Sequence, residues 1–122
     1  MPANDPITTS VTHRDGVAVV AVSGDVDVAT VATLEESITE ALATKPTALI
    51  IDLSDVDFLA SAGLQTLVAT NEAVTKTTTG FAVVAHGPAT SRPIQLTGLD
   101  QVFSLYPTLA EAIAAVSAAS QN

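Results

Sequence analysis

The chain has little of the chemistry that thiols and aromatic rings provide. Its 122 residues include no cysteine and no tryptophan, and the aromatic residues are three phenylalanines and one tyrosine. The absence of cysteine excludes disulfides, thiol catalysis and thiol-based redox sensing. So few aromatic side chains leave little surface for stacking on nucleic-acid bases or sugars.

Basic residues are also scarce. Four Lys and Arg stand against 13 Asp and Glu, which gives a formal net charge of −9 at pH 7. Such a surface repels phosphate backbones and anionic membranes, so we expect no nucleic acid and no membrane as partner, and consider a basic protein instead. Residues 1–10 lack the features of a signal peptide, and no stretch approaches the roughly 20 apolar residues of a membrane span. We therefore expect a cytoplasmic protein.

The residues that are present favour one α/β domain. Apolar residues make up 48% of the chain, enough to fill a single hydrophobic core at this length. Residues 1–6 are predicted to be a flexible N-terminus, followed by one domain over residues 7–119. Short apolar runs predict five strands, at residues 7–12, 17–22, 48–53, 81–85 and 102–105. With the helices between them, the predicted order is β-β-α-β-α-β-α-β-α, a mixed sheet with parallel connections after a first hairpin.

The helices are predicted from spacing and from capping residues. Apolar residues at helical spacing place a stripe on the first helix: Val28, Val31, Leu34, Ile38 and Leu42. Pro88 is expected to open a third, irregular helix, which Pro93 kinks or restarts and Gly98 ends in a left-handed conformation. Thr108 and Glu111 have the spacing of a capping box at the start of the last helix.

The candidate site lies in residues 52–64, where a buried strand leads through an acidic connection into the second helix. Ser61 is predicted to be the N-cap of that helix, and Ala62 and Gly63 leave its first turn with little side-chain cover. The hydroxyl is then reachable, and a helix N-terminus tolerates a phosphate because it carries partial positive charge. The alternative is that Ser61 only caps the helix and Gly63 only permits close packing.

A serine hydrolase is a second alternative, because a serine between a strand and a helix is also the arrangement of a nucleophile elbow. Leu59 replaces the first glycine of the G-x-S-x-G pattern, although Gly63 matches the second. The candidate bases are His13 and His86, and Glu72 is the only acidic residue between Ser61 and His86. The pattern therefore lacks the context of that fold, and we expect no enzyme activity.

Phosphoaspartate, nucleotide and metal sites are less well supported. An acidic pocket for Mg²⁺ would draw on Asp25, Asp27, Asp52 or Asp57, but a receiver domain also needs a lysine after its last strand, where residues 104–106 read Ser-Leu-Tyr. No glycine-rich phosphate-binding motif is present, and two isolated histidines do not have metal-ligand spacing. We expect no cofactor and no metal.

Three segments in order resemble one family. Residues 23–27 (SGDVD) follow the second predicted strand, residues 57–64 (DFLASAGL) contain Ser61, and residues 96–99 (LTGL) precede Val102 and Phe103. In these segments, and over nearly its whole length, the chain resembles the STAS-domain anti-sigma factor antagonists.

The resemblance implies a partner switch. The unmodified antagonist binds an anti-sigma factor, which is a serine kinase of the histidine-kinase-like ATPase fold, and thereby releases a sigma factor. Phosphorylation frees the kinase, and a serine phosphatase resets the cycle. ATP and Mg²⁺ belong to the partner. By position Ser61 matches the acceptor serine, and the resemblance implies that the partner is bound by Asp25, Asp27, Asp57, Leu59, Ala60, Ala62, Gly63 and Leu64.

Two residues depart from the family pattern. Ala60 stands where the family usually has an acidic residue before the acceptor, and Ala62 stands where a second hydroxyl is common. Ala60 before the acceptor serine alters the segment that a kinase would recognise. It keeps open the alternative of a STAS adaptor in a transporter or signalling complex that is not phosphorylated.

Overall fold

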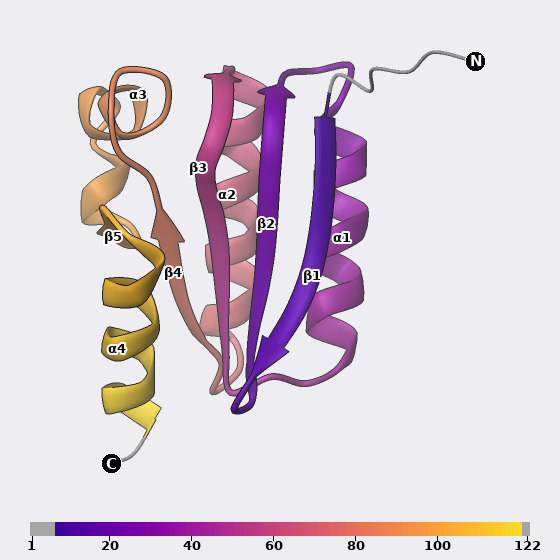
Figure 1. Cartoon of the computed structure of the whole chain (residues 1–122), viewed down its shortest axis with the longest axis vertical. Helices are drawn as coiled ribbons and strands as arrows, with labels where there is room; N and C mark the ends of the chain where they lie inside the picture. The colour runs from indigo at the N-terminus through magenta and orange to yellow at the C-terminus, as the bar shows by residue number, and fades with distance from the viewer. Residues whose placement is uncertain (1–6, 121–122) are drawn as a thin grey trace.

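The structure, a computed structural model, describes residues 7–120, with side chains to residue 117, so the predicted flexible N-terminus lies outside the described residues. Five strands form one sheet in the order β1-β2-β3-β4-β5 (Figure 1). β1 pairs antiparallel with β2, and all later pairs are parallel. The strands are β1 (Ile7–Arg14), β2 (Val17–Val26), β3 (Ala48–Leu59), β4 (Gly80–Val84) and β5 (Ser104–Tyr106).

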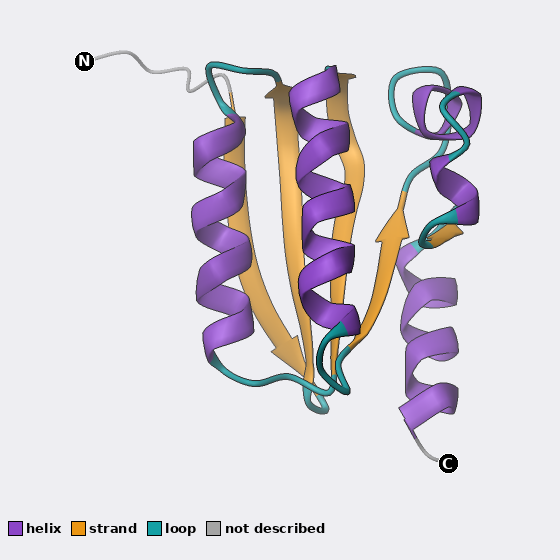
Figure 2. Cartoon of the chain, turned by 180° about the vertical axis from the view of Figure 1, so that it is seen from behind, coloured by secondary structure: helices purple, strands orange, loops and turns teal. Residues whose placement is uncertain are grey.

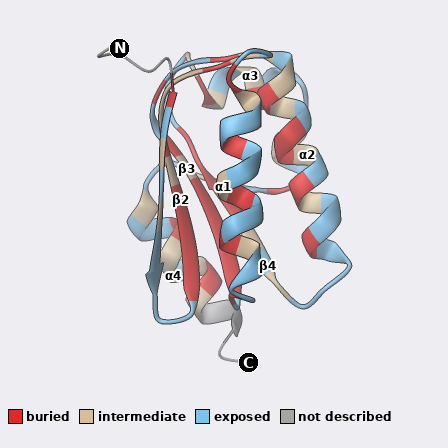
Figure 3. Cartoon of the chain, turned by 90° about the vertical axis from the view of Figure 1, so that its right-hand side faces the viewer, coloured by how far each residue is buried: buried red, intermediate tan, exposed pale blue. Residues whose placement is uncertain are grey.

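Helices cover both faces of the sheet. They are α1 (Val31–Ala43), α2 (Ser61–Thr75), α3 (Ser91–Leu96), the 3₁₀ helix η1 (Leu99–Gln101) and α4 (Leu109–Ser120). α1 and α2 lie side by side on one face, and α4 lies on the other, toward β4 (Figure 2). The strand faces toward the helices are buried, whereas the outer sides of α1 and α2 are exposed (Figure 3). The predicted mixed sheet with four α-helices is confirmed.

The β1–β2 hairpin turns at Asp15 and Gly16. Both have positive φ, 53° and 85°, between the paired residues Arg14 and Val17. Positive φ at both central positions defines a type I′ turn, which matches the twist of a hairpin and favours the Asp-Gly sequence found here. The predicted hairpin at residues 13–16 is therefore confirmed.

β3 is longer and less regular than the predicted strand at residues 48–53. Its register against β2 shifts twice, between Ala21 and Ser23 and again between Gly24 and Asp25, and each shift inserts one extra residue in β3. Each bulge adds a second exposed residue between buried ones. The acidic residues predicted to form a connection are instead part of this bulged strand.

The first helix starts later than its apolar stripe predicts. Val28 is 83% exposed and precedes α1. The carboxylate of Asp27 accepts hydrogen bonds from the amides of Ala29 (2.9 Å) and Thr30 (3.1 Å), which holds residues 27–30 in a turn. An aspartate that bonds amides two and three residues ahead competes with helix, so placing Val28 on the helix was wrong.

Pro88 does not open the third helix, and Pro93 does not kink it. Residues 87–90 turn instead, with Gly87 at a φ of 92° and its carbonyl accepting the amide of Arg92. Pro93 is the third residue of α3, where an amide has no intrahelical acceptor and its loss costs nothing. Gly98 has the expected left-handed conformation, with a φ of 78°.

Thr108 caps the last helix as predicted, but the Glu111 carboxylate bonds the Thr108 hydroxyl where a capping box would use the Thr108 amide. The amide of Glu111 donates to the Thr108 hydroxyl at 3.2 Å, and that hydroxyl donates to the Glu111 carboxylate at 3.1 Å. Within residues 7–120, no helix is both long enough and apolar enough to cross a membrane.

Candidate functional site

Ser61 is the first residue of α2, and Ala60 is its N-cap. Ala60 has an extended backbone (φ −88°, ψ 173°), and its carbonyl accepts the amides of Gly63 (2.9 Å) and Leu64 (3.1 Å). An N-cap has a non-helical conformation while its carbonyl already accepts the first helical bond, so the prediction that Ser61 caps the helix was wrong. Because the N-cap is alanine, no side chain caps this helix.

The Ser61 side chain is exposed and, among the described residues, its hydroxyl has no hydrogen-bond partner. The amides of a helix's first turn also lack intrahelical acceptors. The start of α2 therefore presents an exposed Ser61 hydroxyl, as residues 52–64 predict, but this hydroxyl does not cap the first-turn amides.

The end of β2 is tied to the start of α2. The amide of Ala60 donates to the carbonyl of Val26 at 2.8 Å, continuing the register in which Val26 pairs with Leu59. Asp27 comes directly after Val26, and Ser61 comes directly after Ala60. Both therefore lie at the same edge of the sheet. Two segments that are far apart in the sequence are thus brought together.

A buried threonine holds the β2–α1 loop beside this edge. Thr30 is 4% exposed, and its hydroxyl donates to the carbonyl of Asp25 at 2.8 Å and accepts the amide of Asp27 at 2.9 Å. The Asp27 carboxylate is occupied by the turn described above, whereas Asp25 is half-buried and Asp57 is exposed. These three carboxylates lie at the ends of β2 and β3 near the start of α2, and among the described residues none accepts a hydrogen bond from Ser61.

Gly63 and Leu59 shape the site from inside. Both are buried, and a Cβ on Gly63 would lie 2.6 Å from Cδ1 of Leu59 and 2.7 Å from Cγ1 of Val26. At such distances the side chains of Leu59 and Val26 would have to shift, so glycine allows α2 to approach the sheet this closely without strain. Ala60, Ala62 and Leu64 are half-buried and remain available at the surface.

The structure brings neither histidine into a hydrogen bond with Ser61. His13 lies at the other end of β1, where Nε2 is 3.1 Å from the Thr44 hydroxyl. His86 is exposed just after β4. The nucleophile–base bond that a serine hydrolase uses is therefore not present among the described residues.

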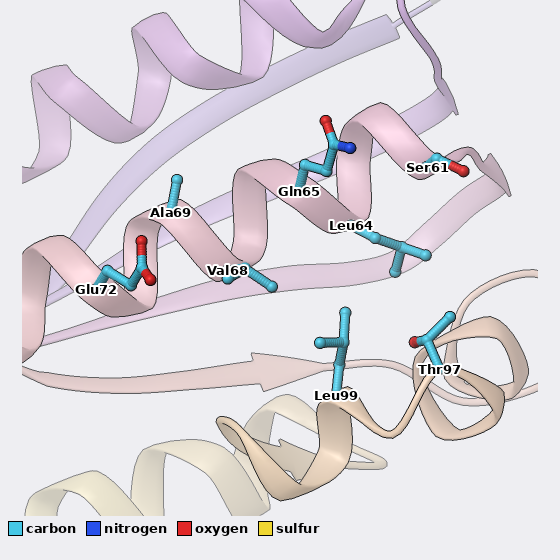
Figure 4. Close-up of a pocket in the computed structure, with 8 residues that line it drawn as sticks. All are labelled: Ser61, Leu64, Gln65, Val68, Ala69, Glu72, Thr97 and Leu99. Carbon is cyan, nitrogen blue, oxygen red and sulfur yellow. The ribbon is translucent and has the colours of Figure 1, made fainter.

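An apolar groove that the sequence did not reveal extends from Ser61. It lies between α2 and the α3–η1 segment and encloses about 380 Å³. Leu64 and Val68 point across it toward Leu99, while Gln65 points away (Figure 4). The groove is lined by Ser61, Leu64, Gln65, Val68, Ala69, Glu72, Thr97 and Leu99.

Four large apolar side chains are exposed among the described residues. Val28 follows β2, Phe58 stands near the end of β3 and is 53% exposed, and Leu96 and Val102 flank η1. Phe58 could have been found from the sequence, as an aromatic residue in an acidic segment. Leu96 and Val102 lie where the short elements α3 and η1 end, which spacing does not predict.

Comparison with known proteins identifies the family. The STAS domain model matches residues 8–112. The anti-sigma-F factor antagonist RsfB of Mycobacterium tuberculosis is 49% identical over 116 residues, which cover 95% of this chain and 94% of RsfB.

Solved structures agree with that assignment. A crystal structure of an anti-sigma factor antagonist from Mycobacterium paratuberculosis superimposes with a TM-score of 0.88 at 56% identity, covering 96% of this chain and 99% of the other. The antagonist SpoIIAA in its unphosphorylated form shares the fold, with a TM-score of 0.75 at 18% identity over 91% and 97% of the two chains. SpoIIAA from Bacillus has also been solved in its phosphorylated form. The resemblance in sequence is therefore confirmed, and the chain belongs to the STAS domain family.

Proposed function

We propose that this protein is an anti-sigma factor antagonist. In this proposal it binds an anti-sigma factor kinase while Ser61 carries a free hydroxyl, and it is released when that hydroxyl is phosphorylated. The observation that carries the proposal is the exposed Ser61 hydroxyl, without a hydrogen-bond partner among the described residues, at the first position of α2. The antagonist names of relatives that align along nearly the whole chain support the same reading.

The phosphoryl transfer would use groups of the partner. The Ser61 oxygen attacks the γ-phosphorus of ATP bound to the kinase, the bond to the β-phosphate oxygen breaks, and ADP leaves. The serine proton passes to a base on the kinase. This chain contributes the acceptor hydroxyl, held on a rigid helix end.

The local structure is compatible with both states of Ser61. The unpaired amides and the positive end of the α2 dipole can solvate a phosphate, so modification leaves the fold intact. The phosphate adds about 1.5 to 2 negative charges next to Asp25, Asp27 and Asp57. A phosphate dianion in a closed interface would have to lose its hydration. A desolvation cost of a few kcal/mol weakens binding by orders of magnitude.

The test is a capture experiment from host lysate with wild type, Ser61→Ala and Ser61→Glu, read by mass spectrometry. We expect a kinase-fold anti-sigma factor on wild type and Ser61→Ala, none on Ser61→Glu, and a Ser61 phosphopeptide in the wild type. The same partners on all three proteins, with no phosphate on Ser61, would instead support the adaptor alternative that Ala60 keeps open.

A further inference from the structure

The groove between α2 and the α3–η1 segment has no occupant within the described chain, although its walls are apolar. Leu64 and Val68 stand one turn apart on α2 and face Leu99 across the gap (Figure 4). Its volume of about 380 Å³ falls within the range of natural binding sites. An open apolar groove of this kind is a surface on which a ligand or partner can bind.

The surroundings of the groove favour a protein over a small molecule. Leu96 is 74% exposed and Val102 is 46% exposed, and both belong to the same α3–η1 segment that forms one wall. They extend the apolar surface beyond the groove itself. Leu64 and Val68 have the i, i+4 spacing that meets the apolar stripe of an amphipathic helix.

Charge defines the chemistry of that helix. Glu72 is the only charged residue that lines the groove, and its carboxylate makes no ion pair among the described residues. Three of the four basic residues, Arg14, Lys45 and Lys76, lie at the opposite edge of the sheet from Ser61, because they end β1 or follow the ends of α1 and α2. The fourth, Arg92, is exposed in α3, but Asp25, Asp57 and Glu72 outnumber it on this side of the molecule, so a complementary partner is basic.

We propose that this groove receives an amphipathic helix of the anti-sigma factor. Apolar side chains of that helix fill the space between Val68 and Leu99, and a basic residue of the helix meets Glu72. The inference rests on the proposed function and adds which surface of this chain contributes the binding free energy. Because Ser61 lines one end of the groove, a phosphate there would confront the same helix with a dianion.

The test measures binding of the purified anti-sigma factor recovered with Ser61→Ala. Val68→Ala and Leu99→Ala each remove apolar contact, and we expect each to weaken binding about tenfold. Leu109→Ala is the matched control, because Leu109 is also half-buried but packs with α4 against the other face of the sheet. Glu72→Lys should weaken binding at low salt and lose this effect at high salt, whereas Glu36→Lys on the exposed side of α1 should not.

A second kind of variant protects the test against misfolding. Thr97 is exposed and faces the groove, so Thr97→Phe fills the space from the rim, although it also removes the hydrogen bonds from the Thr97 hydroxyl to the carbonyls of Pro93 and Ile94. It should abolish binding while the melting temperature stays within a few degrees of wild type. If Val68→Ala, Leu99→Ala and Thr97→Phe bind like wild type while Ser61→Glu does not, the groove proposal is wrong and the proposed function stands. If Ser61→Glu binds as well as Ser61→Ala, the proposed function fails, and the groove proposal fails with it.

Discussion

The amide of Ala60 and the carbonyl of Val26 form a 2.8 Å hydrogen bond that fixes the start of α2 against the end of β2. This bond places the N-cap of α2 at the sheet edge, where a polar side chain could bond the free amides of the first turn. Alanine provides no such group. The N-terminus of the helix that carries Ser61 is therefore tied to β2 by a backbone hydrogen bond and has no side-chain cap.

Replacing Ala60 with a capping residue should stabilise the protein. Asn or Asp at an N-cap is worth about 1 kcal/mol over Ala, so Ala60→Asn should raise the free energy of unfolding by that amount in urea denaturation. Ala60→Asp should gain less if the carboxylates of Asp27 and Asp57 repel it. Ala73→Asp, an exposed position near the other end of α2, serves as control and should be destabilising. No gain from Ala60→Asn would mean that Ala60 is not the N-cap in solution.

Gly63→Ala should destabilise, although the same change in an ordinary helix stabilises by about 1 kcal/mol. The new Cβ would approach Leu59 and Val26 to within 2.6 and 2.7 Å, and such overpacking costs about 1–3 kcal/mol. Thermal and urea unfolding measure the effect. The added change Val26→Ala opens space for the methyl group, so the double variant should lose less than the sum of the single losses. Simple additivity would contradict the contact.

The sequence predicted the order of strands and helices because each apolar run is long enough to fix its type. It did not predict the two bulges of β3, since the extra residues are set by pairing with β2 and not by local preference. Val28 was misplaced because the Asp27 turn interrupts an otherwise helical stripe. The groove could not be predicted, because Leu99 meets Leu64 and Val68 only through tertiary packing.

The two segments that the resemblance assigns to one site come together in the structure, but the details differ from the prediction. Residues 57–64 and 23–27 were identified as one site, and the register of β2 against β3 brings them together. The N-cap was assigned one residue too late because serine is a better cap than alanine. Here the pairing of Val26 with Leu59 decides where the helix begins.

Thr30→Val tests the loop beside Ser61. Valine keeps the shape of Thr30 but leaves the carbonyl of Asp25 and the amide of Asp27 without the hydroxyl that joins them, which costs about 1–3 kcal/mol. Thr30→Ser retains the hydroxyl and should lose less. Hydrogen exchange of the Asp27 amide should speed up in Thr30→Val only. Unchanged exchange would show that the loop is held by other bonds.

Two phenylalanines should separate stability from binding. Phe103 is buried and packs edge-to-face on Phe81 with ring centroids 5.9 Å apart, so Phe103→Ala should cost about 3–5 kcal/mol of stability. Phe58 is half exposed, and Phe58→Ala should change stability by no more than about 0.5 kcal/mol.

The same pair tests whether the Ser61 edge is the docking surface. Phe58 lies three residues before Ser61 and is 53% exposed, and exposed aromatic side chains are enriched in protein interfaces. Phe58→Ala should therefore weaken binding of the anti-sigma factor while its unfolding curve overlays that of wild type. Binding equal to wild type would place Phe58 outside the interface. The partner would then contact only the groove side of α2, because Phe58 belongs to β3 and the groove lies between α2 and the α3–η1 segment.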